Sequence, residues 1–378
     1  MKVLGGLSAQ SFLSQYWQKA PLLVRSALPD LSDLIEGDDL AGLATEEAVE
    51  SRLVTANDWR LRHGPFYEDD FAALPEKDWT LLVQAVDHWV PDIAALFDHF
   101  RFIPSWRLDD IMLSYSVPGG GVGPHFDHYD VFLIQLSGQR EWRIGQSCTE
   151  ADDCRDDTEL NILAQFEEQE RWVLEPGDML YVPPGVAHWG TAISEGITCS
   201  IGFRAPARAE VWNEFAHFMA EQDSDFQRYA DPDLEPRTNP HRVSEADIDR
   251  VQRLLAQLTS DREAIAEWFG RYMTEPKYGE TSTDEPAFTQ TEIQQQLLQQ
   301  PLLRNRAGRL AYVPGQLFIQ GHAFATELNE DQLLWLCDRS ELKSTDIQQR
   351  LNGLSAELLT ELVQRDVFYF ADAEEDWL

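Results

Sequence analysis

The sequence has few cysteines, and it lacks long apolar runs. Its four cysteines, Cys148, Cys154, Cys199 and Cys337, include no CxxC pair and form no dense framework. This pattern excludes a disulfide scaffold and indicates reduced thiols in a cytosolic protein. No stretch approaches the roughly 18 consecutive apolar residues of a membrane span. The N-terminal stretch has no long apolar core, so we expect no signal peptide and a cytoplasmic location.

Basic residues are also scarce. The chain has 30 Lys and Arg against 66 Asp and Glu, which gives a formal net charge of -36. Such a surface repels phosphates, so direct nucleic-acid binding is not expected, and an encounter with a basic partner is favoured. Hydrophobic residues make up 43% and aromatic residues 11% of the 378 positions. These proportions indicate a folded protein of about two or three domains.

The N-terminal part of the chain is expected to mix helices and strands. A helix is predicted to begin after Ser8 and to end before Pro21, because the residue before a proline disfavours the helical conformation. The segment 78–100 repeats apolar residues at helical spacing, for example at Leu82 and Val86. This spacing predicts a helical segment there.

The pattern then changes twice. Short apolar strands separated by Gly and Pro turns fill 107–204 and predict a mainly β domain, a sandwich or a barrel. Helical periodicity returns after Pro206, where Phe215 and Phe218 belong to an apolar stripe that we expect to be buried in a two-fold dimer. The segment 274–286 is poor in apolar residues and is typical of a linker. The predicted domains are a catalytic domain at 1–205, a helical region with its linker at 206–285, and a compact α+β unit at 286–378.

The stretch GPHFDHYDVF, residues 123–132, contains metal-ligand side chains. If it is extended, His125, Asp127 and Tyr129 share one face. A further imidazole, His188, follows the turn-rich sequence LEPGDMLYVPPGVA. Two histidines and one carboxylate form the facial triad of non-haem Fe(II) oxygenases, whereas a structural zinc site would use four protein ligands and favour cysteine. The pattern therefore predicts an iron centre.

Four segments carry a resemblance to a known family. SVPGGGVGPHFDHYDVFLIQLSGQREWRIG and LEPGDMLYVPPGVAHWG, together with LVQAVDHW and SIGFRAP, resemble the bacterial ribosomal oxygenases. Those are Jumonji-C-type enzymes that use Fe(II), 2-oxoglutarate and O2 to hydroxylate an arginine of the large-subunit ribosomal protein L-sixteen. The resemblance implies a double-stranded β-helix (cupin/Jumonji-C) catalytic domain, a helical dimerisation region of a homodimer, and a C-terminal winged-helix-like domain. It also implies a basic ribosomal protein as the substrate.

The co-substrate carries a distal carboxylate, which needs a cation and hydroxyl donors inside the barrel. Arg140 follows a Ser-Gly turn, and period-two alternation places it on one face with Trp142. Ser114 and Ser116 share a face of the strand DIMLSYS. Arg140 with Ser114 or Ser116 is therefore a candidate clamp for 2-oxoglutarate, and the resemblance implies the same residues.

The resemblance also implies that Asp110, Met112 and Tyr129 hold the substrate arginine. A carboxylate can pair with a guanidinium while an aromatic ring stacks on its plane. One carboxylate does not distinguish arginine from lysine, so a hydroxylase or demethylase acting on histidine or methyl-lysine of another basic protein stays an alternative.

Two further alternatives are a non-redox metal-binding cupin and a non-catalytic interaction protein. The carboxylate ligand Asp127 and the Arg140 clamp favour the oxygenase. The candidate C-terminal helices ELNEDQLLWLCD and SAELLTELVQRD are acidic, so a protein-binding or structural role is expected for this domain rather than DNA binding.

Overall fold

A computed structural model describes residues 2–28, 31, 34–222, 228–236, 238–239, 241–277 and 288–371. The chain forms two compact units, Met1–Ala205 and Pro206–Leu378, and each is described by itself.

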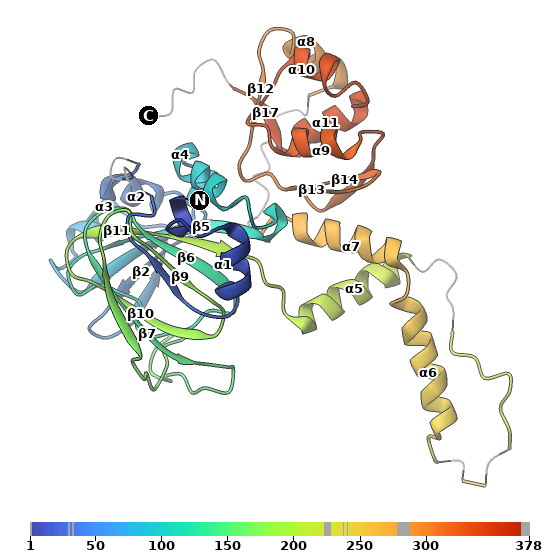
Figure 1. Ribbon diagram of the computed structural model, residues 1–378, viewed down its shortest axis with the longest axis horizontal. Coiled ribbons are helices and arrows are strands. Elements are labelled where there is room, and N and C mark those ends of the chain that lie inside the picture. The colour runs from blue at the N-terminus through green and yellow to red at the C-terminus, as the bar shows by residue number, and fades with distance from the viewer. Residues whose placement is uncertain are drawn as a thin grey trace. The chain divides into compact units, whose positions relative to one another are not determined.

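A large antiparallel sheet dominates the first unit (Figure 1). It has eight strands in the order β1-β9-β6-β11-β5-β4-β2-β3. Their bounds are β1 (Leu22–Val24), β2 (Ser51–Thr55), β3 (Arg60–His63), β4 (Trp79–Val83), β5 (Leu108–Ser116), β6 (Asp130–Gln135), β9 (Met179–Val182) and β11 (Gly196–Phe203).

A smaller sheet faces the large one. It has three antiparallel strands in the order β10-β7-β8, which are β7 (Arg140–Ser147), β8 (Glu170–Leu174) and β10 (Val186–Ala192). Val131 and Leu133 of β6 pack in one buried cluster with Trp142 and Ile144 of β7, so the inner faces of the two sheets contact each other. Facing sheets whose inner side chains interdigitate form a closed core with room for a site inside.

The first unit also contains helices and helical turns, several of which pack against strands of the large sheet. They are η1 (Lys2–Leu4), α1 (Ala9–Gln15), α2 (Gly37–Leu43), α3 (Glu68–Ala72), η2 (Val86–His88), α4 (Pro91–Ala94), η3 (Ala95–Phe100) and η4 (Ser105–Arg107). The predicted helix after Ser8 is confirmed as α1, whose N-terminus is capped when the Ser8 side chain accepts from the Ser11 amide. Phe12 of α1 is fully buried against Tyr181, with ring centroids 5.0 Å apart.

The helical prediction for 78–100 is wrong in its first part. Residues 79–83 form the fully buried strand β4, which pairs with β2 and β5. A short apolar run is compatible with a buried strand or a buried helix, and here pairing on both sides selects the strand. Ala85 then turns the chain with a left-handed φ of 51°, and helical turns follow only from Val86.

The second unit begins with α5 (Arg208–Gln222), α6 (Glu245–Leu258) and α7 (Arg262–Thr274). Its remaining elements are α8 (Gln290–Gln296), β12 (Leu302–Arg304), β13 (Leu310–Val313), β14 (Gln316–Ile319), β15 (His322–Ala325), α9 (Glu330–Cys337), β16 (Glu341–Leu342), α10 (Ser344–Gln349), α11 (Ala356–Gln364) and β17 (Phe368–Phe370). They include two three-stranded sheets, β16-β12-β17 and β13-β14-β15. None of the helices in the described part of the chain combines the length and the apolar character needed to cross a membrane.

Two observations concern the predicted division of this unit into 206–285 and 286–378. Helix α7 packs against β14, because a Cβ atom on Gly270 would lie 2.2 Å from the Phe318 ring. The predicted linker 274–286 lies largely outside the described residues, which stop at 277 and resume at 288.

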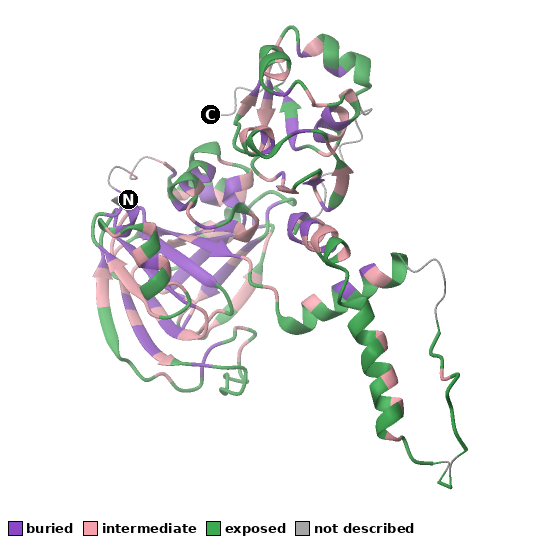
Figure 2. Ribbon diagram, turned by 45° about the vertical axis from the view of Figure 1, so that its right-hand side comes forward, coloured by how far each residue is buried: buried purple, intermediate pink, exposed green. Residues whose placement is uncertain are grey.

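The apolar stripe of α5 is covered by another helix of the same chain. Phe215 and Phe218 are buried in a cluster with Trp268 of α7, and the rings of Phe215 and Trp268 lie 5.3 Å apart. Their predicted burial in a dimer is therefore wrong, because the same chain already covers them. Four exposed apolar side chains lie on α6, where Figure 2 shows mostly exposed residues. They are Ile248, Val251, Leu255 and Leu258.

Candidate metal centre and adjoining pocket

His125, Asp127 and His188 lie together between the two sheets. Each offers one ligand atom, and these atoms lie within 4.8 Å of one another. Nε2 of His188 is 3.5 Å from Oδ2 of Asp127. In the described part of the chain, no other group of His, Cys, Asp and Glu side chains converges in this way. The predicted residues are thus brought together by the fold.

The backbone holds these residues by pairing with β10. The His125 amide donates to the His188 carbonyl over 3.1 Å, and the His188 amide donates back over 2.8 Å. The Gly185 amide donates to the Asp127 carbonyl over 2.8 Å. Both ends of the HxD stretch are therefore fixed to the strand that carries the third ligand.

The stretch 125–132, whose extended conformation would place His125, Asp127 and Tyr129 on one face, is a strand only from Asp130. The strand β6 begins only at Asp130, and His125 makes an isolated bridge within a loop. Gly119 and Gly123 in this loop have φ values of 84° and 82°, a region that glycine enters without strain. These turns interrupt the sheet ladder, while the pairing with β10 still aligns His125 with His188.

The two imidazoles are prepared as metal ligands. Nδ1 of His125 lies 3.0 Å from the Gly123 carbonyl, and Nδ1 of His188 lies 3.0 Å from the Val186 carbonyl. A carbonyl only accepts, so each Nδ1 carries the proton and each Nε2 keeps its lone pair. Burial, reinforced by the neighbouring His125, lowers the pKa of His188 to about 4. His188 is therefore neutral at pH 7, which is the form that binds a metal.

Arg140 reaches from β7 to the large sheet. Its Nη1 donates to Ser116 Oγ over 3.1 Å and to Ser114 Oγ over 3.4 Å. Ser116 Oγ also lies 2.9 Å from Thr80 Oγ1 on β4. The alternation along β5 and β7 therefore brings the predicted clamp residues together.

Among the residues that the structure describes, this guanidinium has no anionic partner. Arg140 is 4% exposed. Burial alone lowers its pKa to about 10, so it stays charged at pH 7. Within the described part of the chain no carboxylate pairs with it, and its Nε has no hydrogen-bond partner. A buried cation is costly unless a counter-charge completes it, so a small carboxylate fits this position.

Sequence reasoning missed two residues of this clamp. A Cβ atom on Gly190 of β10 would lie 2.5 Å from Arg140 Nε and 2.8 Å from the Trp142 ring, so only glycine leaves the guanidinium room. Thr80 is a fully buried polar residue in the apolar strand WTLLV. A threonine inside such a run was a usable signal, since buried hydroxyls need partners.

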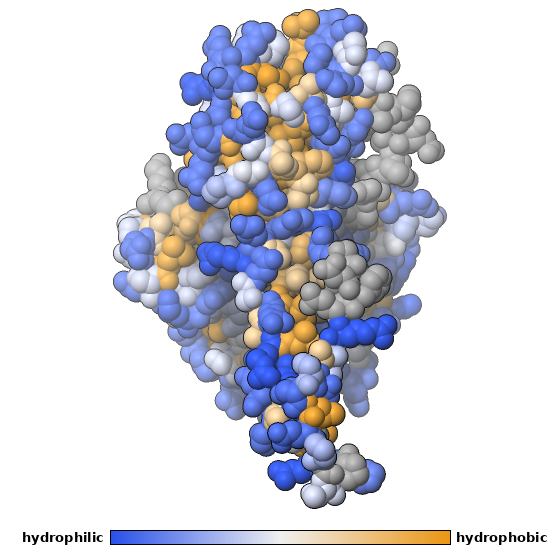
Figure 3. All heavy atoms as spheres, turned by 90° about the vertical axis from the view of Figure 1, so that its right-hand side faces the viewer, coloured by the Kyte–Doolittle hydropathy of each residue, from blue (hydrophilic) through white to orange (hydrophobic). Residues whose placement is uncertain are grey.

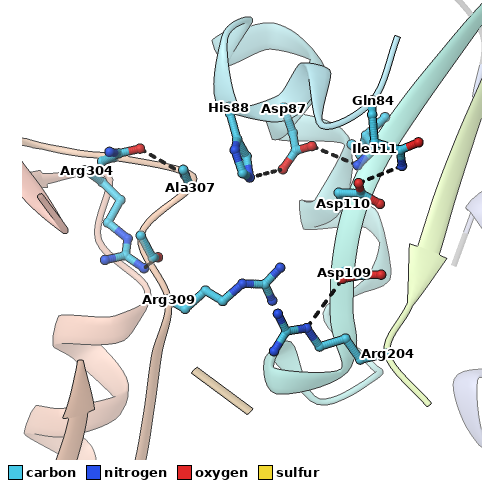
Figure 4. A network of polar contacts seen from close by, with 12 residues as sticks. Gln84, Asp87, His88, Asp109, Asp110, Ile111, Arg204, Arg304, Ala307 and Arg309 are labelled. Carbon is cyan, nitrogen blue, oxygen red and sulfur yellow. Dashed lines mark hydrogen bonds and ion pairs between the residues drawn. The ribbon is translucent and has the colours of Figure 1, made fainter. Parts of the chain in front are cut away.

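The proposed substrate residues lie at the other end of β5. Asp110 is buried and Met112 is half-buried, whereas Tyr129, just before β6, is 41% exposed. The Asp127 carboxylate is the largest cause that raises the pKa of Tyr129, followed by burial and by Asp110. Tyr129 is therefore a neutral phenol in the field of both carboxylates. Figure 4 shows Asp110 receiving a hydrogen bond from Gln84.

Two facing sheets around a His-Asp-His cluster and a buried arginine define a JmjC-type oxygenase domain of the cupin fold. A JmjC domain model matches residues 95–211, and a ROXA-like winged-helix model matches 255–369. The predicted fold class, a mainly β catalytic domain followed by a winged-helix-like domain, is thereby confirmed.

Comparison with similar proteins identifies the family within this class of oxygenase domains. The ribosomal protein uL16 3-hydroxylase of Escherichia coli (strain K12) is 39% identical over 305 residues, which cover 80% of this chain and 81% of that protein. The X-ray structure of E. coli ycfD matches with a TM-score of 0.89 at 35% identity, over 97% of this chain and 99% of that one. A ribosomal oxygenase YcfD structure in complex with cobalt and 2-oxoglutarate matches with a TM-score of 0.86 at 35% identity, over 97% and 99%. The chain belongs to the bacterial ribosomal oxygenase family.

Proposed function

We propose that this protein uses Fe(II), 2-oxoglutarate and O2 to hydroxylate an arginine side chain of the ribosomal protein uL16. The observation that carries the proposal is a buried arginine for which the described residues supply no counter-charge, inside the same barrel as a His-Asp-His cluster. The name of the E. coli relative supplies uL16 as the substrate. Because that substrate is a ribosomal protein, we place the enzyme in the cytoplasm.

In this proposal His125, Asp127 and His188 hold the iron. Two neutral imidazoles and one carboxylate form a facial set that leaves positions open for the co-substrates. The bound iron, with 2-oxoglutarate and O2, supplies the oxidising power that inserts one oxygen atom into a C–H bond. The hydrogen bonds from both Nδ1 atoms to carbonyls keep the imidazoles oriented.

Arg140, Ser114 and Ser116 receive the distal carboxylate of 2-oxoglutarate. The guanidinium supplies charge and the hydroxyls supply donors, so the carboxylate replaces water with charge-assisted hydrogen bonds. Thr80 holds Ser116 in place. The clamp sets the depth at which the co-substrate sits and thereby directs its other end toward the metal.

Asp110, Met112 and Tyr129 receive the substrate side chain. The buried carboxylate of Asp110 pairs with a cation, and the exposed Tyr129 ring stacks on a guanidinium plane. The carboxylate of Asp110 attracts a cationic side chain more strongly than a neutral histidine, which favours a cationic substrate residue over the histidine alternative.

The second unit supports a homodimer. The exposed residues Ile248, Val251, Leu255 and Leu258 recur at helical spacing along α6 and form one apolar stripe. Figure 3 shows hydrophobic residues reaching the surface on the face that includes α5, α6 and α7. A two-fold axis would bury this stripe against itself. Analytical ultracentrifugation at micromolar concentration should show a dimer, and Leu255→Glu should shift it to monomer, whereas the control Gln252→Glu on α6 should not.

One experiment tests the activity. Purified protein is incubated in air with Fe(II), 2-oxoglutarate and recombinant uL16, and the peptides are analysed by mass spectrometry. We expect the gain of one oxygen atom on an arginine-containing peptide, together with succinate formation, and neither without iron. Hydroxylation of a different basic ribosomal protein, with uL16 unchanged, would refute the substrate.

A further inference from the structure

Two side chains without an assigned role hold the carboxylate of Asp110. Gln84, directly after β4, donates from Nε2 to Oδ2 of Asp110 over 2.7 Å (Figure 4). Arg52 on β2 donates from Nη2 to Oε1 of Gln84, also over 2.7 Å. Since a guanidinium only donates, Arg52 determines which end of the Gln84 amide faces Asp110. The three side chains therefore form a directional chain from Arg52 to Asp110.

The turn after β4 holds β5 at a second point. Asp87 Oδ1 accepts from the Ile111 amide over 2.7 Å, and Asp87 is buried. The left-handed residue Ala85 separates Gln84 from the turn η2 that carries Asp87. One short segment thus holds the side chain of residue 110 and the backbone of residue 111 (Figure 4). Gln84 therefore holds the side chain of Asp110 at a point where the backbone of β5 is held by Asp87.

Arg52 also contacts a second residue of the substrate pocket. Its Nη2 lies 3.7 Å from Sδ of Met112. Arg52 is therefore part of the surroundings of the substrate side chain although it is distant in sequence.

We infer that Arg52 and Gln84 are positioning residues that make the Asp110 pocket selective for a guanidinium over an ammonium group; this inference rests on the proposed function. A guanidinium presents a rigid planar fork of donors, and it pairs well only with a carboxylate whose plane is fixed. An ammonium group is a compact charge that is indifferent to that plane. The hydrogen bond from Gln84 to Oδ2 restrains the rotation of the Asp110 carboxylate, and Arg52 maintains that hydrogen bond.

Binding of two small probes tests the inference without turnover. N-acetyl-L-arginine amide and N-acetyl-L-lysine amide are titrated into the full-length protein, and dissociation constants are measured by NMR. The wild type should prefer the arginine probe by about tenfold, the value of one charged hydrogen bond. Gln84→Met, which keeps the side-chain length but has no donor, should weaken arginine-probe binding about tenfold and lysine-probe binding less than about twofold. An equal loss for both probes, or an unchanged preference, would overturn the inference.

A second pair of variants separates positioning from general stability. Arg52→Met should reduce the preference as Gln84→Met does, and Arg52→Lys should recover part of it, because an ammonium group can still donate to Gln84 Oε1. Arg62→Met on the neighbouring strand β3 is the matched control, since Arg62 pairs with Asp70 and not with Gln84. This control should leave the preference unchanged. Equal behaviour of the Met and Lys variants at position 52 would contradict the directional chain.

Failure of the positioning role can be distinguished from failure of the proposed function. If Gln84→Met loses the wild-type preference for the arginine probe but the wild type does not hydroxylate uL16, the proposed substrate fails and the positioning role stands. If uL16 is hydroxylated while its KM is the same in the wild type and in Gln84→Met, the proposed function stands and the positioning role fails.

Discussion

One face of β5 passes through two different environments. At one end Ser114 and Ser116 are buried beside Arg140, whose side chain is 4% exposed and bridges to the small sheet. At the other end Asp110 adjoins the half-buried Met112 and lies near Tyr129, which is 41% exposed. The closed end suits a small dianion, because its cation is buried and held in place by hydrogen bonds to Ser114 and Ser116. The open end suits a side chain that stays attached to a large protein.

The electrostatics of the two ends also differ. Arg140 is a cation without a carboxylate in the part of the chain that the structure describes. The Tyr129 end is instead dominated by the carboxylates Asp127, Asp110 and Asp109. In our proposal these fields direct an anion to one end of β5 and a cation to the other. A single strand can supply residues to both binding positions because alternate residues share a face.

The largest expected effect comes from the cluster that both ends share. Asp127→Ala should reduce turnover by more than about a hundredfold for any substrate, because it removes a ligand. The side chain of Asp127 is 22% exposed and its backbone bond to Gly185 remains, so the fold should persist. Iron content, circular dichroism and oxygen incorporation check this. Full turnover with iron still bound would show that the cluster is not the metal site.

The next effect should be confined to the closed end. Arg140→Met should raise the KM for 2-oxoglutarate by about a hundredfold or more, since losing one partner of a buried charged pair costs about 3–5 kcal/mol. The KM for uL16 should change little. Arg143→Met is the matched control, because Arg143 is on the same strand but stacks on Trp189 at 3.6 Å. Equal effects of the two variants would place the clamp elsewhere.

The reciprocal effect at the open end should be smaller. Tyr129→Ala should raise the KM for uL16 about tenfold, because an aromatic face on a guanidinium contributes about 1 kcal/mol or somewhat more. The KM for 2-oxoglutarate should stay near its wild-type value. Tyr129→Phe keeps the ring and should retain most of the affinity. If Tyr129→Phe and Tyr129→Ala were equally impaired, the hydroxyl rather than the ring would be the contact.

The sequence pattern also predicted the two ends of β5 to different extents. The closed end follows from period-two alternation, because Ser114, Ser116 and Arg140 lie in regular strands. The HxD motif identified the metal cluster although 125–129 is a loop. Backbone pairing of His125 with His188 on β10 brings these ligands together, as pairing within a sheet would have done. The mainly β domain and the winged helix were likewise predicted from pattern and resemblance.

What the sequence did not reveal depends on long-range contacts. The strand β4 has apolar residues on both faces, so its periodicity carried no signal that distinguishes it from a helix. Phe215 of α5 is buried against Trp268 of α7, whereas Leu255 of α6 is exposed, and this difference depends on where α7 packs. Gln84 and Arg52 meet Asp110 from other strands, without a motif that links them.

The smallest effect concerns how each reactant arrives. The net charge of -36 should accelerate the encounter with a basic protein, and salt shortens the reach of that attraction from about 10 Å at 0.1 M to about 3 Å at 1 M. We expect kcat/KM for free uL16 to fall several-fold as NaCl rises over this range, because steered association depends on unscreened charge. The KM for 2-oxoglutarate should change less, because the cation that receives it is buried. Stopped-flow association of labelled uL16 with an Asp127→Ala variant isolates the encounter from chemistry. A rate that is independent of salt would mean that the acidic surface does not steer the substrate, even if both ends of the barrel bind as proposed.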